Sequence, residues 1–172
     1  MRARLQGKIV VVTGASSGIG CETALAFARA GAHVALAARN EAKLRELVDV
    51  HPGLRDFMLA VPADVTKPDD VEHLFSTVIA QFGRVDILVN NAGIGLRAPI
   101  AETVFEDAQR VMDVNFFGAL RCIQVALPHL KRQPPVLPQD PRAQIVNVGS
   151  ILSAVATPGN GNRSSVTYYP PS

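Results

Sequence analysis

Apolar residues along this chain fall into short continuous runs, separated by stretches in which they recur every three or four positions. The continuous runs are rich in valine, isoleucine and alanine and are bounded by glycine or polar residues, as expected for strands buried on both faces. They predict five strands, at residues 8–13, 32–38, 57–62, 85–90 and 145–148.

The intervening stretches predict helices. One is expected over residues 21–30 and another directly after Asn40, whose side chain is suited to cap it. The clearest helical pattern begins after Thr66, a candidate cap, and ends at Gly83. A long helix is expected over residues 103–130.

Strands that alternate with helices through short joins indicate parallel pairing and right-handed crossovers, so the predicted fold class is α/β with a doubly wound sheet. The pattern does not give the order of the strands. In such sheets, ligands bind beyond the carboxyl ends of the strands. Polar or glycine residues stand at or just after the end of each predicted strand: Gly14, Arg39, Asp64, Asn90 and Ser150.

A glycine-rich turn, T-G-A-S-S-G-I-G at residues 13–20, joins the first strand to the first helix. Such a turn directs backbone N–H groups and the positive end of the helix dipole at one place, which suits a phosphate. Glycine at positions 14, 18 and 20 leaves room for a pyrophosphate or for close helix packing. The alternative is a glycine-rich turn that binds nothing.

Composition narrows the class of protein. A chain of 172 residues with 48% hydrophobic and 19% charged residues fits one soluble globular domain. A net charge of +2 gives no reason to expect binding to nucleic acid or to a membrane. Two cysteines in helical patterns suggest no disulfide framework, so we expect a cytoplasmic protein. The four histidines lack metal-ligand spacing, so no metal site is expected.

Five motifs in this order resemble those of the classical short-chain dehydrogenase/reductase family. They are the glycine pattern T-G-x-x-x-G-x-G, Asp64-Val65, N-N-A-G at residues 90–93, V-N-F-F-G at 114–118 and I-V-N-V-G-S at 145–150. The resemblance covers the chain from about residue 7 to residue 150. It implies a Rossmann-like, mostly parallel sheet that is incomplete on its carboxyl-terminal side, and an oxidoreductase that transfers hydride between a nicotinamide dinucleotide and an alcohol or carbonyl substrate.

The resemblance also implies roles for the matching positions. Asn115 would interrupt the long helix and hold a water molecule in a proton relay, and Ser150 would hydrogen-bond the substrate oxygen, so these two are the expected catalytic residues. The expected cofactor-binding residues are Gly14, Ser16, Ser17, Gly18, Ile19, Gly20, Arg39, Asp64, Val65, Asn91, Ala92 and Gly93.

The residues that follow the second strand bear on the choice of cofactor. An acidic side chain there would accept hydrogen bonds from a ribose 2′-hydroxyl and repel a 2′-phosphate, but the chain has Ala38 and then Arg39. Because a guanidinium suits a phosphate, NADP(H) is favoured over NAD(H). Many NADP-dependent members of the family carry a second basic residue in the glycine turn, where this chain has Ser17.

The chain departs from the family after Ser150. Family members carry a catalytic tyrosine with a lysine four residues later, but the only tyrosines here are Tyr168 and Tyr169, and no lysine follows Lys131. We therefore expect a dinucleotide-binding domain over residues 1–157, truncated relative to the family, and an irregular, disordered tail over residues 158–172. A proline-rich surface insertion is expected at residues 134–141.

Three interpretations follow. The chain is the amino-terminal part of an NADP(H)-dependent alcohol/carbonyl oxidoreductase, inactive as written; or it is a catalytically dead module that binds dinucleotide or pairs with an intact relative; or it is a non-functional fragment from an early stop or altered reading frame. The partners implied are the dinucleotide, a small-molecule substrate in a full-length form, and a second copy of the chain as in the family's oligomers.

Overall fold

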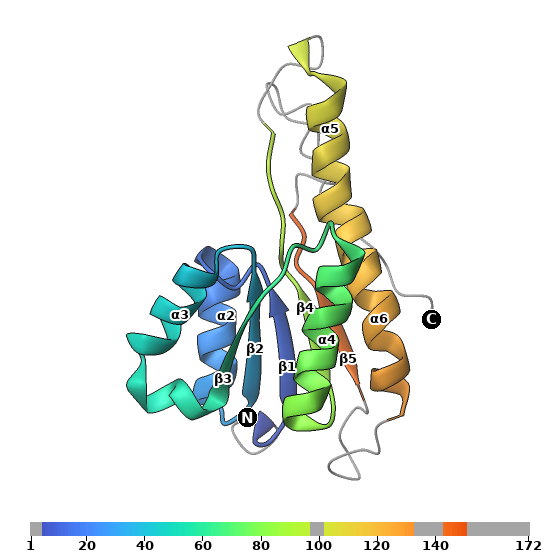
Figure 1. The fold of residues 1–172 in the computed structure, drawn as a ribbon. Helices are drawn as coiled ribbons and strands as arrows, with labels where there is room; N and C mark the ends of the chain where they lie inside the picture. The colour runs from blue at the N-terminus through green and yellow to red at the C-terminus, as the bar shows by residue number, and fades with distance from the viewer. Residues whose placement is uncertain (1–4, 97–101, 133–142, 151–172) are drawn as a thin grey trace.

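Five parallel strands form one sheet in the computed structural model, which describes residues 5–96, 102–132 and 143–150 (Figure 1). The spatial order is β3-β2-β1-β4-β5. The chain therefore builds outward from β1 in one direction and then returns to add β4 and β5 on the other side. The strands are β1 (Ile9–Thr13), β2 (His33–Ala38), β3 (Met58–Pro62), β4 (Ile87–Asn90) and β5 (Gln144–Asn147).

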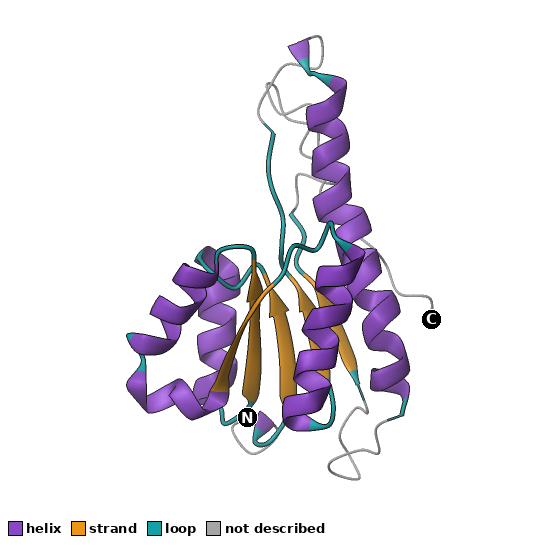
Figure 2. Ribbon diagram, viewed as in Figure 1, coloured by secondary structure: helices purple, strands orange, loops and turns teal. Residues whose placement is uncertain are grey.

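Helices cover both faces of the sheet, as Figure 2 shows. On one face α2 (Gly18–Arg29) and α3 (Glu41–Asp49) pack against one set of alternate strand residues, and on the other α4 (Pro68–Phe82) and α6 (Ala119–Lys131) pack against the opposite set. The doubly wound α/β fold predicted from the sequence is confirmed. The remaining elements are the 3-10 helix η1 (Pro52–Phe57), α5 (Phe105–Met112) and the π-helical segment η3 (Asp113–Gly118).

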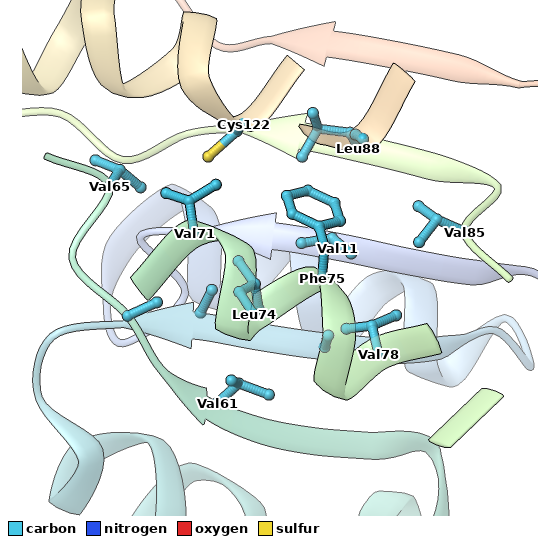
Figure 3. Packing of buried hydrophobic residues seen from close by; sticks show 14 of the residues in the cluster. Val11, Val61, Val65, Val71, Leu74, Phe75, Val78, Val85, Leu88 and Cys122 are labelled. Carbon is cyan, nitrogen blue, oxygen red and sulfur yellow. The ribbon is translucent and has the colours of Figure 1, made fainter. Parts of the chain in front are cut away.

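The core on the α4 side is centred on Phe75, whose side chain is 1% exposed (Figure 3). Val71, Leu74 and Val78 of the same helix are fully buried, as the helical spacing of these residues requires. Cys122 of α6 belongs to the same cluster. Burying one such side chain contributes about 1.5–3 kcal/mol, so α4 is one of the main sources of stability.

The helix boundaries confirm two predicted signals and contradict a third. Asn40 caps α3, because its Oδ1 accepts a hydrogen bond from the Lys43 N–H at 3.0 Å. Gly83 ends α4 with φ of 75°. Thr66 is not the cap of α4: the capping position is Lys67, which makes no side-chain cap bond, and the Thr66 hydroxyl donates to Asp64 instead.

The long helix expected over residues 103–130 is interrupted around Asn115, as the resemblance implies. It runs as α5, then six residues of π-helix from Asp113 to Gly118, then α6. Within the described residues, β5 pairs only with β4, and its side chains are exposed, including Ile145 and Val146. The predicted insertion at 134–141 and the predicted tail at 158–172 lie outside the described residues, so the domain boundary stays a prediction.

Asp86, a fully buried carboxylate just before β4, joins β1 and β4 at their amino-terminal ends. Its Oδ2 accepts the Ile9 N–H at 2.8 Å, while its own N–H donates to the Ile9 carbonyl. The Arg84 guanidinium donates to both carboxylate oxygens and supplies the opposite charge. Asp86 therefore locks β1 to β4 at the end of the sheet opposite the glycine turn.

Candidate functional site

A cleft of about 830 Å³ opens at the carboxyl ends of the strands, where the order of the sheet reverses between β1 and β4. This is the position at which doubly wound sheets bind ligands. Nine of the twelve predicted cofactor-binding residues line it: Gly14, Ser16, Ser17, Arg39, Asp64, Val65, Asn91, Ala92 and Gly93. Sequence reasoning did not assign the others to the site: Ala37, Ala38, Asn40, Glu41, Ala63, Ile94 and Val114.

The three remaining predicted residues, Gly18, Ile19 and Gly20, form the first turn of α2 rather than the cleft lining. This helix starts after Ser17 with no side-chain cap and no acidic residue in its first turn. Its leading N–H groups are therefore available to an anion. Gly18 has φ of 55°, and a Cβ there would meet nothing within 4 Å, so the space beside the turn is open.

Two glycines of the turn are required by packing against the segment after β4. A Cβ on Gly14 would lie 2.8 Å from the Ala92 Cα, and Gly14 has φ of 66°. A Cβ on Gly20 would lie 2.3 Å from the Asn91 Nδ2 and 2.4 Å from the Gly14 carbonyl oxygen. Of the two uses expected for these glycines, close packing is the one that the contacts document.

Thr13, the last residue of β1, holds the two segments together. Its hydroxyl oxygen accepts the backbone N–H groups of both Asn91 and Ala92 at 3.0 Å, and the hydroxyl donates to the Val89 carbonyl at 3.4 Å. The Asn91 amide donates in turn to the carbonyls of Thr13 and Gly14. Sequence reasoning missed this role, although Thr13 opens the glycine motif.

The charged side chains that line the cleft are Arg39 and Glu41, which follow β2, and Asp64, which follows β3. Burial raises the pKa of Asp64, but hydrogen bonds from the Thr66 N–H and hydroxyl, with the charges of Arg39 and Lys67, outweigh that effect and lower it below its ordinary value. Asp64 is therefore ionised at neutral pH, and its loop is ordered by its own carboxylate.

With this geometry established, comparison with known proteins identifies the chain. Residues 8–165 match the profile described as short chain dehydrogenase. The chain belongs to the short-chain dehydrogenase family. Members of this family are oxidoreductases that bind a nicotinamide dinucleotide and a small-molecule substrate.

Several short-chain dehydrogenases resemble the chain over most of its length. It is 36% identical over 152 residues to a fatty acyl-CoA reductase of Acinetobacter baylyi, covering 87% of this chain and 49% of that protein. It is 35% identical over 159 residues to the 3-oxoacyl-[acyl-carrier-protein] reductase FabG of Thermotoga maritima, covering 92% and 62%. The chain thus spans between about half and three fifths of the length of these curated relatives.

A solved structure gives the same fold. A 7 alpha-hydroxysteroid dehydrogenase complexed with NADH and 7-oxo glycochenodeoxycholic acid superposes with a TM-score of 0.84 at 29% identity, covering 95% of this chain and 61% of that one. The Rossmann-like fold expected from the motifs is therefore confirmed, with a sheet that is incomplete relative to these short-chain dehydrogenases.

The two predicted catalytic residues do not line the cleft. Asn115 lies in the π-helical segment, where its amide exchanges two hydrogen bonds with the backbone of Ile94, at 2.9 and 3.0 Å. A Cβ on Gly93 would lie 3.3 Å from the Asn115 Oδ1. Asn115 thus braces the segment that borders the cleft, while Ser150 lies three residues past the end of β5 and is exposed.

The described residues contain neither a candidate metal site nor a candidate membrane-spanning helix. Among residues 5–96, 102–132 and 143–150, no group of three or more histidine, cysteine or acidic side chains is placed to hold a metal ion. In the same ranges no helix has the length and apolar character needed to cross a membrane. Tyr168 and Tyr169 lie outside the described residues.

Proposed function

We propose that this chain is the NADP(H)-binding part of an oxidoreductase that acts on an alcohol or carbonyl substrate. The observation that carries the choice of cofactor is Arg39. It lines the cleft directly after β2, where Ala38 takes the place of the acidic side chain that would bind a ribose 2′-hydroxyl. A guanidinium there offers paired, charge-assisted hydrogen bonds to a 2′-phosphate.

The rest of the cleft supports a dinucleotide. The uncapped start of α2 and the open space beside Gly18 suit the pyrophosphate. Asp64 and Val65, which line the cleft after β3, are proposed to contact the adenine. Asn91, Ala92 and Gly93 are proposed to support the nicotinamide half, since they border the cleft beyond β4.

The bound dinucleotide would supply or accept the hydride. The chain's own residues would orient the reactants: Ser150 is proposed to hydrogen-bond the substrate oxygen, and Asn115 to hold the Ile94 segment and a relay water in place. The 172 residues contain no tyrosine with a lysine four positions later, so no side chain of the expected kind is present to donate the proton. We propose that this chain binds the cofactor but does not turn over substrate on its own.

A calorimetric titration of the purified chain with NADPH and NADH tests the proposal. Saturable NADPH binding that is tighter than NADH binding is expected. Arg39→Gln should weaken NADPH binding by about tenfold or more, because it removes a charge-assisted contact, and leave NADH nearly unchanged. Arg55→Gln is the matched control, since Arg55 forms an exposed ion pair with Asp49 and does not line the cleft.

Two results would contradict the proposal. A folded sample with no saturable binding of either nucleotide would refute the cofactor assignment. A spectrophotometric assay with NADPH over a panel of ketones and aldehydes should give no rate above background, and clear turnover would refute the argument from the missing tyrosine and lysine. The second candidate function is a catalytically dead module that pairs with an intact relative. It predicts the same saturable NADPH binding and, in addition, association of this chain with that relative.

A further inference from the structure

The cleft carries an acidic residue where the proposed 2′-phosphate would sit. Glu41 is the first residue of α3, it lines the cleft, and it follows Arg39 by two positions. Asn40 occupies the N–H of Lys43, which leaves the N–H groups of Glu41 and Ala42 at the start of this nine-residue helix. The backbone here favours an anion, but a free Glu41 carboxylate would oppose one.

Arg45 neutralises that carboxylate. One helical turn after Glu41, its Nε and Nη2 both donate to the same oxygen, Oε1, at 3.0 and 2.6 Å. Arg45 does not line the cleft, so its guanidinium reaches the site only through Glu41. The two side chains are 71% and 48% exposed, so the pair is hydrated and its energetic effect is small.

The balance of charge makes this small effect matter. Among the residues that line the cleft, Arg39 contributes one positive charge, and Glu41 and Asp64 one negative charge each, which leaves a net charge of −1. Arg39 also interacts with Asp64, whose pKa it helps to lower. A site with that balance disfavours a 2′-phosphate unless Glu41 is compensated, and Arg45 is the residue in contact with it.

We propose that Arg45 is a specificity-determining residue that acts by holding and neutralising Glu41, so that the start of α3 accepts a 2′-phosphate. This inference rests on the proposed NADP(H) site and extends it to a positioning residue outside the cleft. Without Arg45, the Glu41 carboxylate is free to turn toward the ribose and repel the phosphate, while a 2′-hydroxyl is tolerated.

The test compares dissociation constants of the full 172-residue chain for NADPH and NADH. Arg45→Gln should weaken NADPH binding about threefold at low ionic strength, because the hydrated Glu41 carboxylate would then repel the nearby 2′-phosphate. The dissociation constant for NADH should stay unchanged. The difference should fall in high salt. Arg55→Gln breaks a similarly exposed ion pair with Asp49, at the opposite end of α3 from Glu41, and should alter neither dissociation constant.

The double variant Glu41→Gln/Arg45→Gln decides the mechanism. It should bind NADPH at least as tightly as the wild type, because the repelling carboxylate is gone. Arg45 does not act through Glu41 if Arg45→Gln weakens NADPH binding as much in the Glu41→Gln background as in the wild type, or if it weakens NADPH and NADH binding alike. Either result overturns this inference and leaves the proposed function standing. A wild-type chain that binds neither nucleotide overturns the proposed function, and this inference with it.

Discussion

Replacing Thr13 by valine tests whether one hydroxyl holds the glycine turn to the segment after β4. Valine is nearly isosteric with threonine and is equally suited to a strand, so the change removes the hydroxyl and little else. The Asn91 and Ala92 N–H groups then lose their acceptor. The Asn91 side-chain bonds to the backbone of Thr13 and Gly14 remain, so the two segments stay in place while the donors are left unpaired.

The magnitude follows from those two donors. A buried N–H without a partner costs about 1–3 kcal/mol, and water in the adjacent cleft keeps the cost at the lower end. We expect Thr13→Val to lower the free energy of unfolding by about 2–4 kcal/mol. Thr13→Ser keeps the oxygen and loses one buried methyl group, since Thr13 is 1% exposed, and should cost only about 1 kcal/mol.

Urea denaturation followed by far-ultraviolet circular dichroism measures both variants against the wild type, with the slope of the transition as the check that the unfolded states are comparable. The valine variant should have the lower midpoint by a clear margin. If Thr13→Val is as stable as Thr13→Ser, the hydroxyl does not hold the turn and the reasoning fails.

The other predictions concern packing, thiols and pH. Gly20→Ala should destabilise the fold by about 2 kcal/mol in the same assay, because the new Cβ would meet the Gly14 carbonyl oxygen. Gly53→Ala is the control: its Cβ would meet nothing within 4 Å, so it should change stability by less than about 0.5 kcal/mol. Equal effects of the two substitutions would contradict the packing argument. Burial raises the pKa of the Cys122 thiol to about 12, so iodoacetamide at pH 8 should label Cys21 first, as read by mass spectrometry, and Cys122 only on unfolding; comparable rates in the folded chain would refute this. The folded-state pKa of Asp64 lies below its ordinary value of 3.8, so the carboxylate stabilises the fold above pH 3.8 and loses this contribution as the pH falls through the folded-state pKa. The difference in free energy of unfolding between wild type and Asp64→Asn should therefore be constant from pH 7 to about 5 and shrink at lower pH. A difference that grows on acidification would contradict the direction of this pKa shift.

Much of the fold was predictable because the sheet is parallel and buried. The run Ile9–Thr13 is buried at every position, so a continuous apolar stretch was a direct sign of the strand. Asn40 and Gly83 act where local chemistry predicts, since capping depends on neighbouring backbone groups only. The strand order and the register depend on contacts between distant segments, which the local pattern does not encode.

The candidate site was predictable as a set of residues and not as a set of contacts. Motif matching selected eight of the nine predicted positions that line the cleft, and Arg39 was selected from its place directly after the second strand. The motifs could not reveal that the Thr13 hydroxyl oxygen accepts hydrogen bonds from Asn91 and Ala92, which follow it in the sequence by 78 and 79 positions. Thr66 was misassigned because the Asp64 carboxylate competes for its hydroxyl, a partner that helix-capping rules alone do not consider.

The π-helical segment, Asp113–Gly118, gives the chain one place where a residue can be lost without turning the flanking helix faces. A π turn accommodates one residue more than an α turn, and each residue advances an α-helix by about 100°. Deleting one residue here would permit continuous α-helix and still leave Cys122, Ala126 and Leu130 facing the core, because the π turn holds one residue more than the α turn that would replace it. A scan of single-residue deletions should therefore find this stretch more tolerant than the interior of α5 or α6, where a deletion turns the rest of the helix by about 100°. A relative that lacks the extra residue can keep both helix faces.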